Sequence, residues 1–287
     1  LDKADETRRL RATALKLRAL ALARRGGAGA ALAAFDQAYA LADGWPALRA
    51  RVLLAWALTL RNWGLFAEAA RLVERSLDLR LQLGDLAGAA ICHGVLAFIW
   101  QRQGDFARER DALVADLRLS ERIGAAADLP GLHVRLAGAL VNLGKYAGAW
   151  DEAERAIALE DARAGAAGGS RTHGFAWREQ ARICGVQRRF ADGLALAERA
   201  RASFARLGDP WGEALSRITA AELQLGAAAE PERADGGVAA RAEAAAALTA
   251  AQPTFVRLGA VPEAAEAMLL AASLRALSGE PDEAAEA

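Results

Sequence analysis

The side chains best suited to chemistry are three histidines, His93, His133 and His173, which recur at a spacing of 40 residues. Such imidazoles could bind zinc, and Cys92 beside His93 could act as a nucleophile with its base. Adjacent residues on a helix point about 100° apart. If 40 residues is a repeat period, equivalent histidines lie roughly 10 Å or more apart, whereas a zinc–nitrogen bond measures about 2.1 Å. We therefore expect packing histidines, no metal site and no cofactor.

Acidic and glycine-rich segments offer no catalytic site either. The carboxylates of residues 151–154 and 160–161 fall on helix faces that we expect to be solvated. The segments 164–169 and 226–238 interrupt the period and read as flexible surface loops. Neither contains the GxxxxGK[ST] run that cradles phosphates. We expect a protein that is not an enzyme.

The elements that would position any site follow a repeat of about 40 residues. Markers are spaced by 38, 40, 40, 44, 38 and 53 residues: Gly26, Gly64, Gly104, Gly144, Arg188, Gly226 and Gly279. A small residue stands seven places before each marker, at Ala19, Ala57, Ala97, Ala137, Ala181, Thr219 and Ala272. A fixed period of this length indicates stacked supersecondary units, which favour a binding surface over an enzyme.

Composition agrees with a helical, intracellular array. Basic and acidic residues number 36 each, so net charge gives no sign of a nucleic-acid or membrane partner. Cys92 and Cys184 show no disulfide or zinc spacing, and the longest apolar stretch, Ala89–Trp100, is too short to span a bilayer. We expect a cytoplasmic location. Because residue 1 is leucine, we also expect a piece of a longer protein.

Each period is predicted to hold two helices that form an antiparallel hairpin. Residues 49–63 and 66–83 both carry the apolar stripe of an amphipathic helix. The segment between them, around Gly64, is long enough only for a tight reversal, in which glycine adopts the left-handed conformation that ends a helix. Asp85 and Asp209 follow similar glycines and should cap the next helix, with Pro210 at its first position.

The pattern resembles the tetratricopeptide repeat. The fourth unit fits best, with Ala137, Leu140, Gly144, Tyr146, Ala149 and Ala156 at the characteristic positions. The resemblance implies an all-α, right-handed superhelical solenoid of six to seven antiparallel hairpins, with repeats at about 10–44, 46–84, 85–124, 129–164, 170–208, 210–259 and 261–287. The repeats are longer than usual, and Glu109 and Asp116 replace small residues. The longer helices and the Leu-Gly-Asp junctions are similar to those of the extended repeats in bacterial multidomain signalling regulators, such as sensor regions of ATPases and transcriptional activators.

The resemblance also implies a concave groove lined by the first helix of each hairpin. The residues at groove positions are Lys16, Arg51, Leu54, Leu58, Arg61, Asn62, Phe98, Gln101, Arg102, Asn142, Arg178 and Arg182. Glu213 is the single acid at these positions. We expect Arg51, Arg61, Arg102, Arg178 and Arg182 to form a basic surface without paired acids. Arginine is common in this chain, and a register error of one residue would remove these side chains from the groove.

The function implied is a protein-interaction module that binds an acidic peptide or protein segment in this groove. The alternative is a ligand- or segment-sensing regulatory region, whose effector domain lies outside this chain and could itself be an intramolecular partner. We expect neither nucleic acid nor membrane as a partner.

Overall fold

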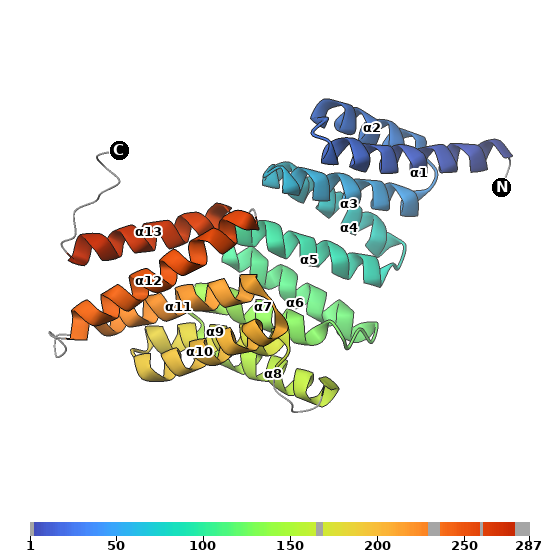
Figure 1. Cartoon of the computed structure of the whole chain (residues 1–287). Helices are drawn as coiled ribbons and strands as arrows, with labels where there is room; N and C mark the ends of the chain where they lie inside the picture. Colours follow the sequence, from blue (N-terminus) through green and yellow to red (C-terminus); the bar gives the residue numbers. More distant parts are fainter. Residues whose placement is uncertain (1–2, 165–168, 229–235, 259–260, 279–287) are drawn as a thin grey trace, which may run out of the picture. The chain divides into compact units, whose positions relative to one another are not determined.

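The computed structural model describes residues 3–164, 169–228, 236–258 and 261–278, and all regular secondary structure in these ranges is helical (Figure 1). The all-α prediction is confirmed. The helices are α1 (Lys3–Arg24), α2 (Ala28–Leu41), α3 (Pro46–Asn62), α4 (Phe66–Gln82), α5 (Leu86–Arg102), α6 (Phe106–Arg122), α7 (Leu129–Asn142), α8 (Tyr146–Ala164), α9 (Arg171–Val186), α10 (Phe190–Leu207), α11 (Pro210–Ala228), α12 (Gly236–Arg257) and α13 (Val261–Ser278).

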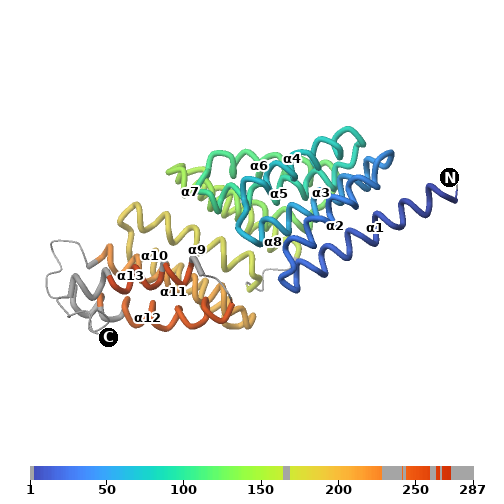
Figure 2. The backbone as a smooth tube through the Cα atoms, turned by 90° about the horizontal axis from the view of Figure 1, so that it is seen from above, coloured from blue at the N-terminus to red at the C-terminus, as the bar shows by residue number. Residues whose placement is uncertain are grey.

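Consecutive helices pair as hairpins, and the turns follow the predicted glycine markers. Helices α1 and α2, α3 and α4, α5 and α6, and α9 and α10 make extensive contacts, and the tube in Figure 2 shows each pair running alongside. Gly26, Gly64, Gly104 and Gly144 adopt positive φ angles of 79°, 79°, 73° and 70°. A left-handed residue ends one helix and lets the chain reverse within three residues.

Two markers behave differently from the rest. Arg188 has a φ of 59°, so the fifth hairpin keeps the left-handed turn without a glycine, at the cost of backbone strain. The prediction of a turn at Gly226 is wrong, because Gly226 lies inside α11. A Cβ there would lie 2.4 Å from the ring of Phe190, so this glycine serves close packing.

The predicted loop at 226–238 is also corrected at its edges. Residues 226–228 end α11 and residues 236–238 begin α12, so both ends are helical. Its centre, 229–235, lies outside the described residues, as do 165–168 of the other interruption and the marker Gly279.

Aspartates start several helices, as predicted. Asp85 Oδ1 accepts from the backbone N–H of Gly88 at 2.9 Å, and Asp209 Oδ1 accepts from Gly212 at 3.1 Å. Asp105 caps α6 in the same way through Arg108. Each carboxylate satisfies an N–H group that has no partner within the helix and opposes the positive end of the helix dipole.

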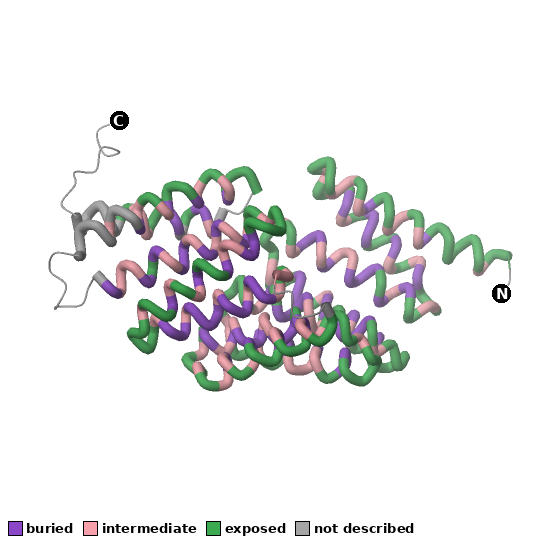
Figure 3. The backbone as a smooth tube through the Cα atoms, turned by 60° about the horizontal axis from the view of Figure 1, so that its bottom comes forward, coloured by how far each residue is buried: buried purple, intermediate pink, exposed green. Residues whose placement is uncertain are grey.

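Small residues form the centre of each hairpin. The residues seven places before the markers are buried from the first hairpin to the sixth: Ala19, Ala57, Ala97, Ala137, Ala181 and Thr219. The exception is Ala272, which is exposed on α13. In Figure 3 buried segments alternate with exposed ones along the helices, as expected when one stripe of each helix faces a neighbour.

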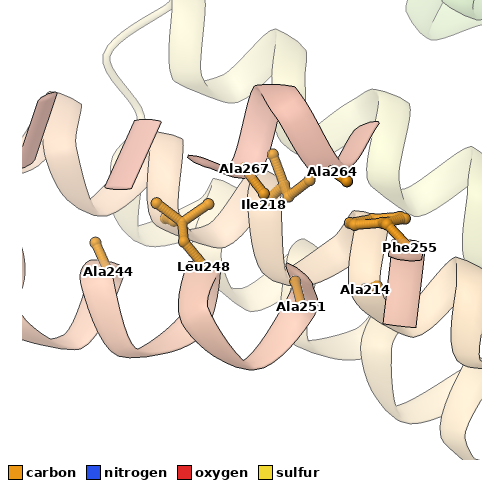
Figure 4. Close-up of a cluster of buried hydrophobic side chains, with 9 residues drawn as sticks. Ala214, Ile218, Ala244, Leu248, Ala251, Phe255, Ala264 and Ala267 are labelled. Carbon is orange, nitrogen blue, oxygen red and sulfur yellow. The ribbon is translucent and has the colours of Figure 1, made fainter. Parts of the chain in front are cut away.

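The chain divides into two compact units, unit 1 (residues 1–129) and unit 2 (residues 130–287). Near the end of unit 2, α11, α12 and α13 share a cluster that includes Ile218, Leu248 and Phe255, with alanines filling the space between them (Figure 4). The predicted single solenoid and its repeat boundaries stay predictions. No helix in the described ranges combines the length and apolarity that a bilayer crossing requires.

Candidate protein-binding faces

In unit 1 the first helices of the hairpins, α1, α3 and α5, form one layer. Helix α3 contacts both α1 and α5, whereas α2, α4 and α6, which are fully described, make no contacts of similar extent with one another. The concave groove itself stays a prediction.

Charge is segregated between the two layers of unit 1. The first helices carry eleven basic and two acidic residues, and both acids, Asp5 and Glu6, lie in the first turn of α1. Helices α3 and α5 contain no acid at all. The second helices carry seven basic and eight acidic residues. The first-helix layer of unit 1 is thus strongly basic, although the whole chain has no net charge.

We define the basic face of unit 1 by six of the residues predicted to line the groove: Lys16, Arg51, Leu58, Arg61, Phe98 and Arg102. Arg51 and Arg102 are exposed, Lys16, Leu58 and Arg61 are half-buried, and Phe98 leaves 38% of its surface exposed. Asn62 and Gln101 are exposed beside them. Leu54 is buried and contributes to the core, so a partner would not reach it.

The cations of the basic face are crowded. Burial lowers the pKa of Lys16, and the neighbouring Arg51 guanidinium lowers that pKa further. Burial also lowers the pKa of Arg61, whose guanidinium lies 4.9 Å from the ring centroid of Phe98 and donates to Asn62 Oδ1 at 3.0 Å. Within the described residues, neither Lys16 nor Arg51 forms an ion pair. An anion bound here would relieve the repulsion and favour the charged forms.

In unit 2 the two arginines predicted to line the groove have an acidic partner. Glu179, buried on α9, accepts from Arg178 at 2.9 Å and from Arg182 at 2.6 Å. Arg182 also donates to Asn142 Oδ1 on α7 at 2.8 Å, and Arg178 donates to the carbonyl of Leu215 on α11 at 3.4 Å. The expectation that these two arginines lack paired acids is therefore wrong. Glu179 offsets part of their charge, and the polar network links three first helices.

Sequence reasoning missed Glu179, although its spacing was a signal. Glu179 stands three residues before Arg182, a spacing at which side chains on a helix are neighbours, so the pair with Arg182 could have been predicted, whereas the pair with the adjacent Arg178 could not. The burial of Glu179 was not visible in sequence, because it depends on α7. A Cβ on Gly138 of α7 would lie 3.6 Å from the Glu179 carboxyl carbon, so α7 covers this side chain.

The histidines pack, and some of the carboxylates expected at the surface are buried beside them. His133 Nδ1 lies 2.5 Å from Glu152 Oε2, and both side chains are largely buried. Glu160 is buried and paired with Arg163 at 2.7 Å. Glu152 and Glu160 therefore correct the expectation of solvated faces.

The other two histidines also have ordinary surroundings. The Nε2 atom of His173 lies 3.0 Å from Asp161, and its Nδ1 lies 3.0 Å from the Ser170 hydroxyl that caps α9. His93 is half-buried, and burial lowers its pKa. No group of three or more metal-binding side chains occurs among the described residues.

These features define a class of protein, an array of helical hairpins with a basic layer of first helices in its first unit. No protein-family model and no curated protein sequence matches the chain. Solved structures do match. The apo form of RapI is similar with a TM-score of 0.67 at 12% identity, over 92% of this chain and 97% of that one.

Two further solved structures are similar to this chain. A signal transduction ATPase with a tetratricopeptide repeat sensor, from Pyrococcus horikoshii, has a TM-score of 0.64 at 11% identity. The match covers 94% of this chain and 39% of that one. A Rap protein complexed with competence and sporulation factor has a TM-score of 0.54 at 12% identity, over 93% and 75% of the two chains. The chain therefore has a tetratricopeptide-repeat-like fold.

Proposed function

We propose that the chain is a protein-interaction module that binds an acidic peptide or protein segment on the basic face of unit 1. The observation that carries the proposal is the pair Lys16 and Arg51. These two neighbouring cations have no ion-pair partner among the described residues, on a layer whose α3 and α5 contain no acid, and a bound anion would relieve their mutual repulsion.

The apolar members of the face favour a peptide over a free inorganic anion. Phe98 is exposed and lies beside Arg61, and Leu58 is half-buried on the same helix as Arg61. A peptide with alternating carboxylates and apolar side chains would use both kinds of group, whereas an inorganic anion would use only the cations. The Rap structure in complex with competence and sporulation factor supports a binding role for this fold.

A selection from random 12-residue peptides displayed on phage tests the proposal on the full chain. We expect the selected peptides to be rich in Asp and Glu. We also expect their binding to weaken as salt rises, because screening shortens the reach of exposed charges. The double change Arg61→Glu and Arg102→Glu should abolish binding while circular dichroism stays unchanged.

The matched control places the same two changes on the other layer. Arg118 and Arg122 are exposed on the second helix α6, so Arg118→Glu with Arg122→Glu alters net charge equally and should leave binding intact. Selected peptides without acids, or equal losses in both double variants, would refute the acidic-peptide proposal.

The second candidate is a sensor region, supported by the similarity to the tetratricopeptide repeat sensor of the signal transduction ATPase. A sensor must change its conformation or dynamics when its ligand binds. Hydrogen exchange with a selected peptide separates the two candidates. Protection confined to unit 1 favours the module, and altered exchange that extends through unit 2 favours the sensor.

A further inference from the structure

A cavity of about 330 Å³ in unit 2 is lined by the second helices α8 and α10 and by the first helix α9. Ile157 of α8 and Leu196 of α10 form apolar walls, and both pack against the cluster around the Trp177 ring of α9. The volume falls in the range of small-molecule sites in proteins. All three helices belong to unit 2, so a single compact unit forms the whole cavity.

The α9 wall of the cavity carries a buried amide without a hydrogen-bond partner. Gln180 leaves only 5% of its surface exposed and lines the cavity. Its side-chain amide forms no hydrogen bond with any described residue. The adjacent Glu179, which is buried to the same degree, pairs with two arginines. Because a buried amide without a hydrogen bond is unfavourable, a ligand that supplies the partner gains affinity from Gln180.

Opposite charges line one end of the cavity from its two sides. Asp161 of α8 lies 3.0 Å from His173 Nε2, and the centroid of the His173 ring lies 5.3 Å from that of Trp177. The Arg199 guanidinium of α10 lies 3.9 Å from the Trp177 ring centroid and forms no ion pair with a described residue. A ligand that carries both an ammonium and a carboxylate group could therefore pair with both side chains.

A second carboxylate lies at the other end of the cavity. Glu154 stands seven residues before Asp161, two turns away on the same face of α8. Helices α8 and α9 run antiparallel, and Asp161 contacts His173 at the start of α9. Glu154 therefore lies further along α9, at the level of Gln180. Its charge disfavours an anionic group there, so the partner that suits Gln180 is neutral.

We propose that this cavity binds a free α-amino acid whose side chain ends in an amide, with glutamine as the best match. The α-carboxylate pairs with Arg199 and the α-ammonium with Asp161. The side-chain amide of the ligand exchanges two hydrogen bonds with Gln180, since each amide offers a donor and an acceptor. Free glutamate fits less well, because its second carboxylate would face Glu154. This site is separate from the basic face of unit 1 and does not depend on it.

Isothermal titration calorimetry of the full chain with L-glutamine tests the proposal. We expect saturable binding at a single site. Three analogues each lack one feature: γ-aminobutyramide has no α-carboxylate, glutaramate has no ammonium, and L-leucine has no amide. Each should bind about tenfold or more weakly than L-glutamine, as expected for the loss of one charged or buried hydrogen-bonding group. Equal binding of L-leucine or glutaramate would overturn the proposal, and so would a lack of saturable binding by L-glutamine.

Arg199→Gln tests the carboxylate contact. It should weaken L-glutamine binding by about tenfold or more and leave the weak binding of γ-aminobutyramide unchanged, because that analogue has no carboxylate. Arg206→Gln is the matched control, since Arg206 is also exposed on α10 and does not line the cavity. Equal losses in the two variants would overturn the proposal. Both positions are exposed, so the fold should survive either change.

Gln180→Met tests the amide contact, because methionine keeps the length of the side chain and removes its hydrogen-bonding groups. This variant should lose the preference for L-glutamine over L-leucine, and a retained preference would overturn the proposal. Arg199→Gln decides the matter if circular dichroism shows that Gln180→Met does not fold. The double change Arg61→Glu and Arg102→Glu should leave L-glutamine binding intact. Loss of binding in that variant would place the ligand on the basic face and overturn the assignment to this cavity.

Discussion

Gly212→Ala gives the sharpest test of the packing in unit 2. Phe204 is fully buried, with Gly174 of α9 on one side and Gly212 of α11 on the other. A Cβ at Gly212 would lie 2.2 Å from the Phe204 ring, and one at Gly174 would lie 2.6 Å from it. Carbon atoms pack at about 3.5–4.0 Å, so the ring or the α11 backbone must move by more than 1 Å.

The expected cost follows from two opposing terms. Overpacking a core typically costs about 1–3 kcal/mol, and replacing a helical glycine with alanine returns up to about 1 kcal/mol. Gly131→Ala is the matched control, because Gly131 is also the third residue of a first helix and a Cβ there meets nothing within 4 Å. The second term is common to both variants, so their difference measures the clash.

Urea unfolding followed by far-ultraviolet circular dichroism measures this difference, and hydrogen exchange locates it. We expect Gly212→Ala to be less stable than Gly131→Ala by about 1–3 kcal/mol, with faster exchange in α9 to α11. Equal stabilities for the two variants would show that the Phe204 ring does not lie against α11, and the close approach of α9, α10 and α11 described above would then be wrong.

Three further changes test individual residues. Arg188→Gly should raise stability by up to about 1 kcal/mol, because glycine removes the left-handed strain; a lower urea midpoint would contradict this. The hydrogen bond from Arg163 lowers the pKa of Glu160, so that side chain stabilises the protein above its ordinary pKa and the effect is lost as pH falls through the lowered value. Urea midpoints of Glu160→Gln should therefore fall below those of the unmodified protein at pH 7, and the gap should narrow in acid. Glu179→Gln should cost about 1–3 kcal/mol, because it leaves Arg178 and Arg182 less neutralised, and it should leave acidic-peptide binding to unit 1 unchanged in anisotropy measurements; an unchanged urea midpoint would contradict the role of Glu179 in stability.

The features that were predicted correctly from the sequence are local ones. The hairpin turn at Gly64, the caps at Asp85 and Asp209, and the small crossing residues such as Ala137 were all predicted from sequence. Each depends on conformations or spacings within a few residues of the chain, and the repeat period adds independent copies of the same signal. The half-exposed placement of Arg61 and Phe98 on one face follows from the same helical register.

Tertiary structure alone decided which of the charged side chains are buried. Glu152 and Glu160 lie on helix faces that look solvated in sequence, yet neighbouring helices bury both. Gly226 falls in the glycine series but packs against Phe190 within a helix.

At the candidate site, too, the sequence did not predict which charged groups are paired. Five arginines were expected to share one basic surface, and in unit 2 a buried carboxylate pairs with two of them, Arg178 and Arg182. Periodicity determines which face of a helix a residue occupies. Whether a charged group is buried depends on elements that folding brings from other helices, here Gly138 of α7, which covers Glu179, and Asn142 of α7, which accepts from Arg182.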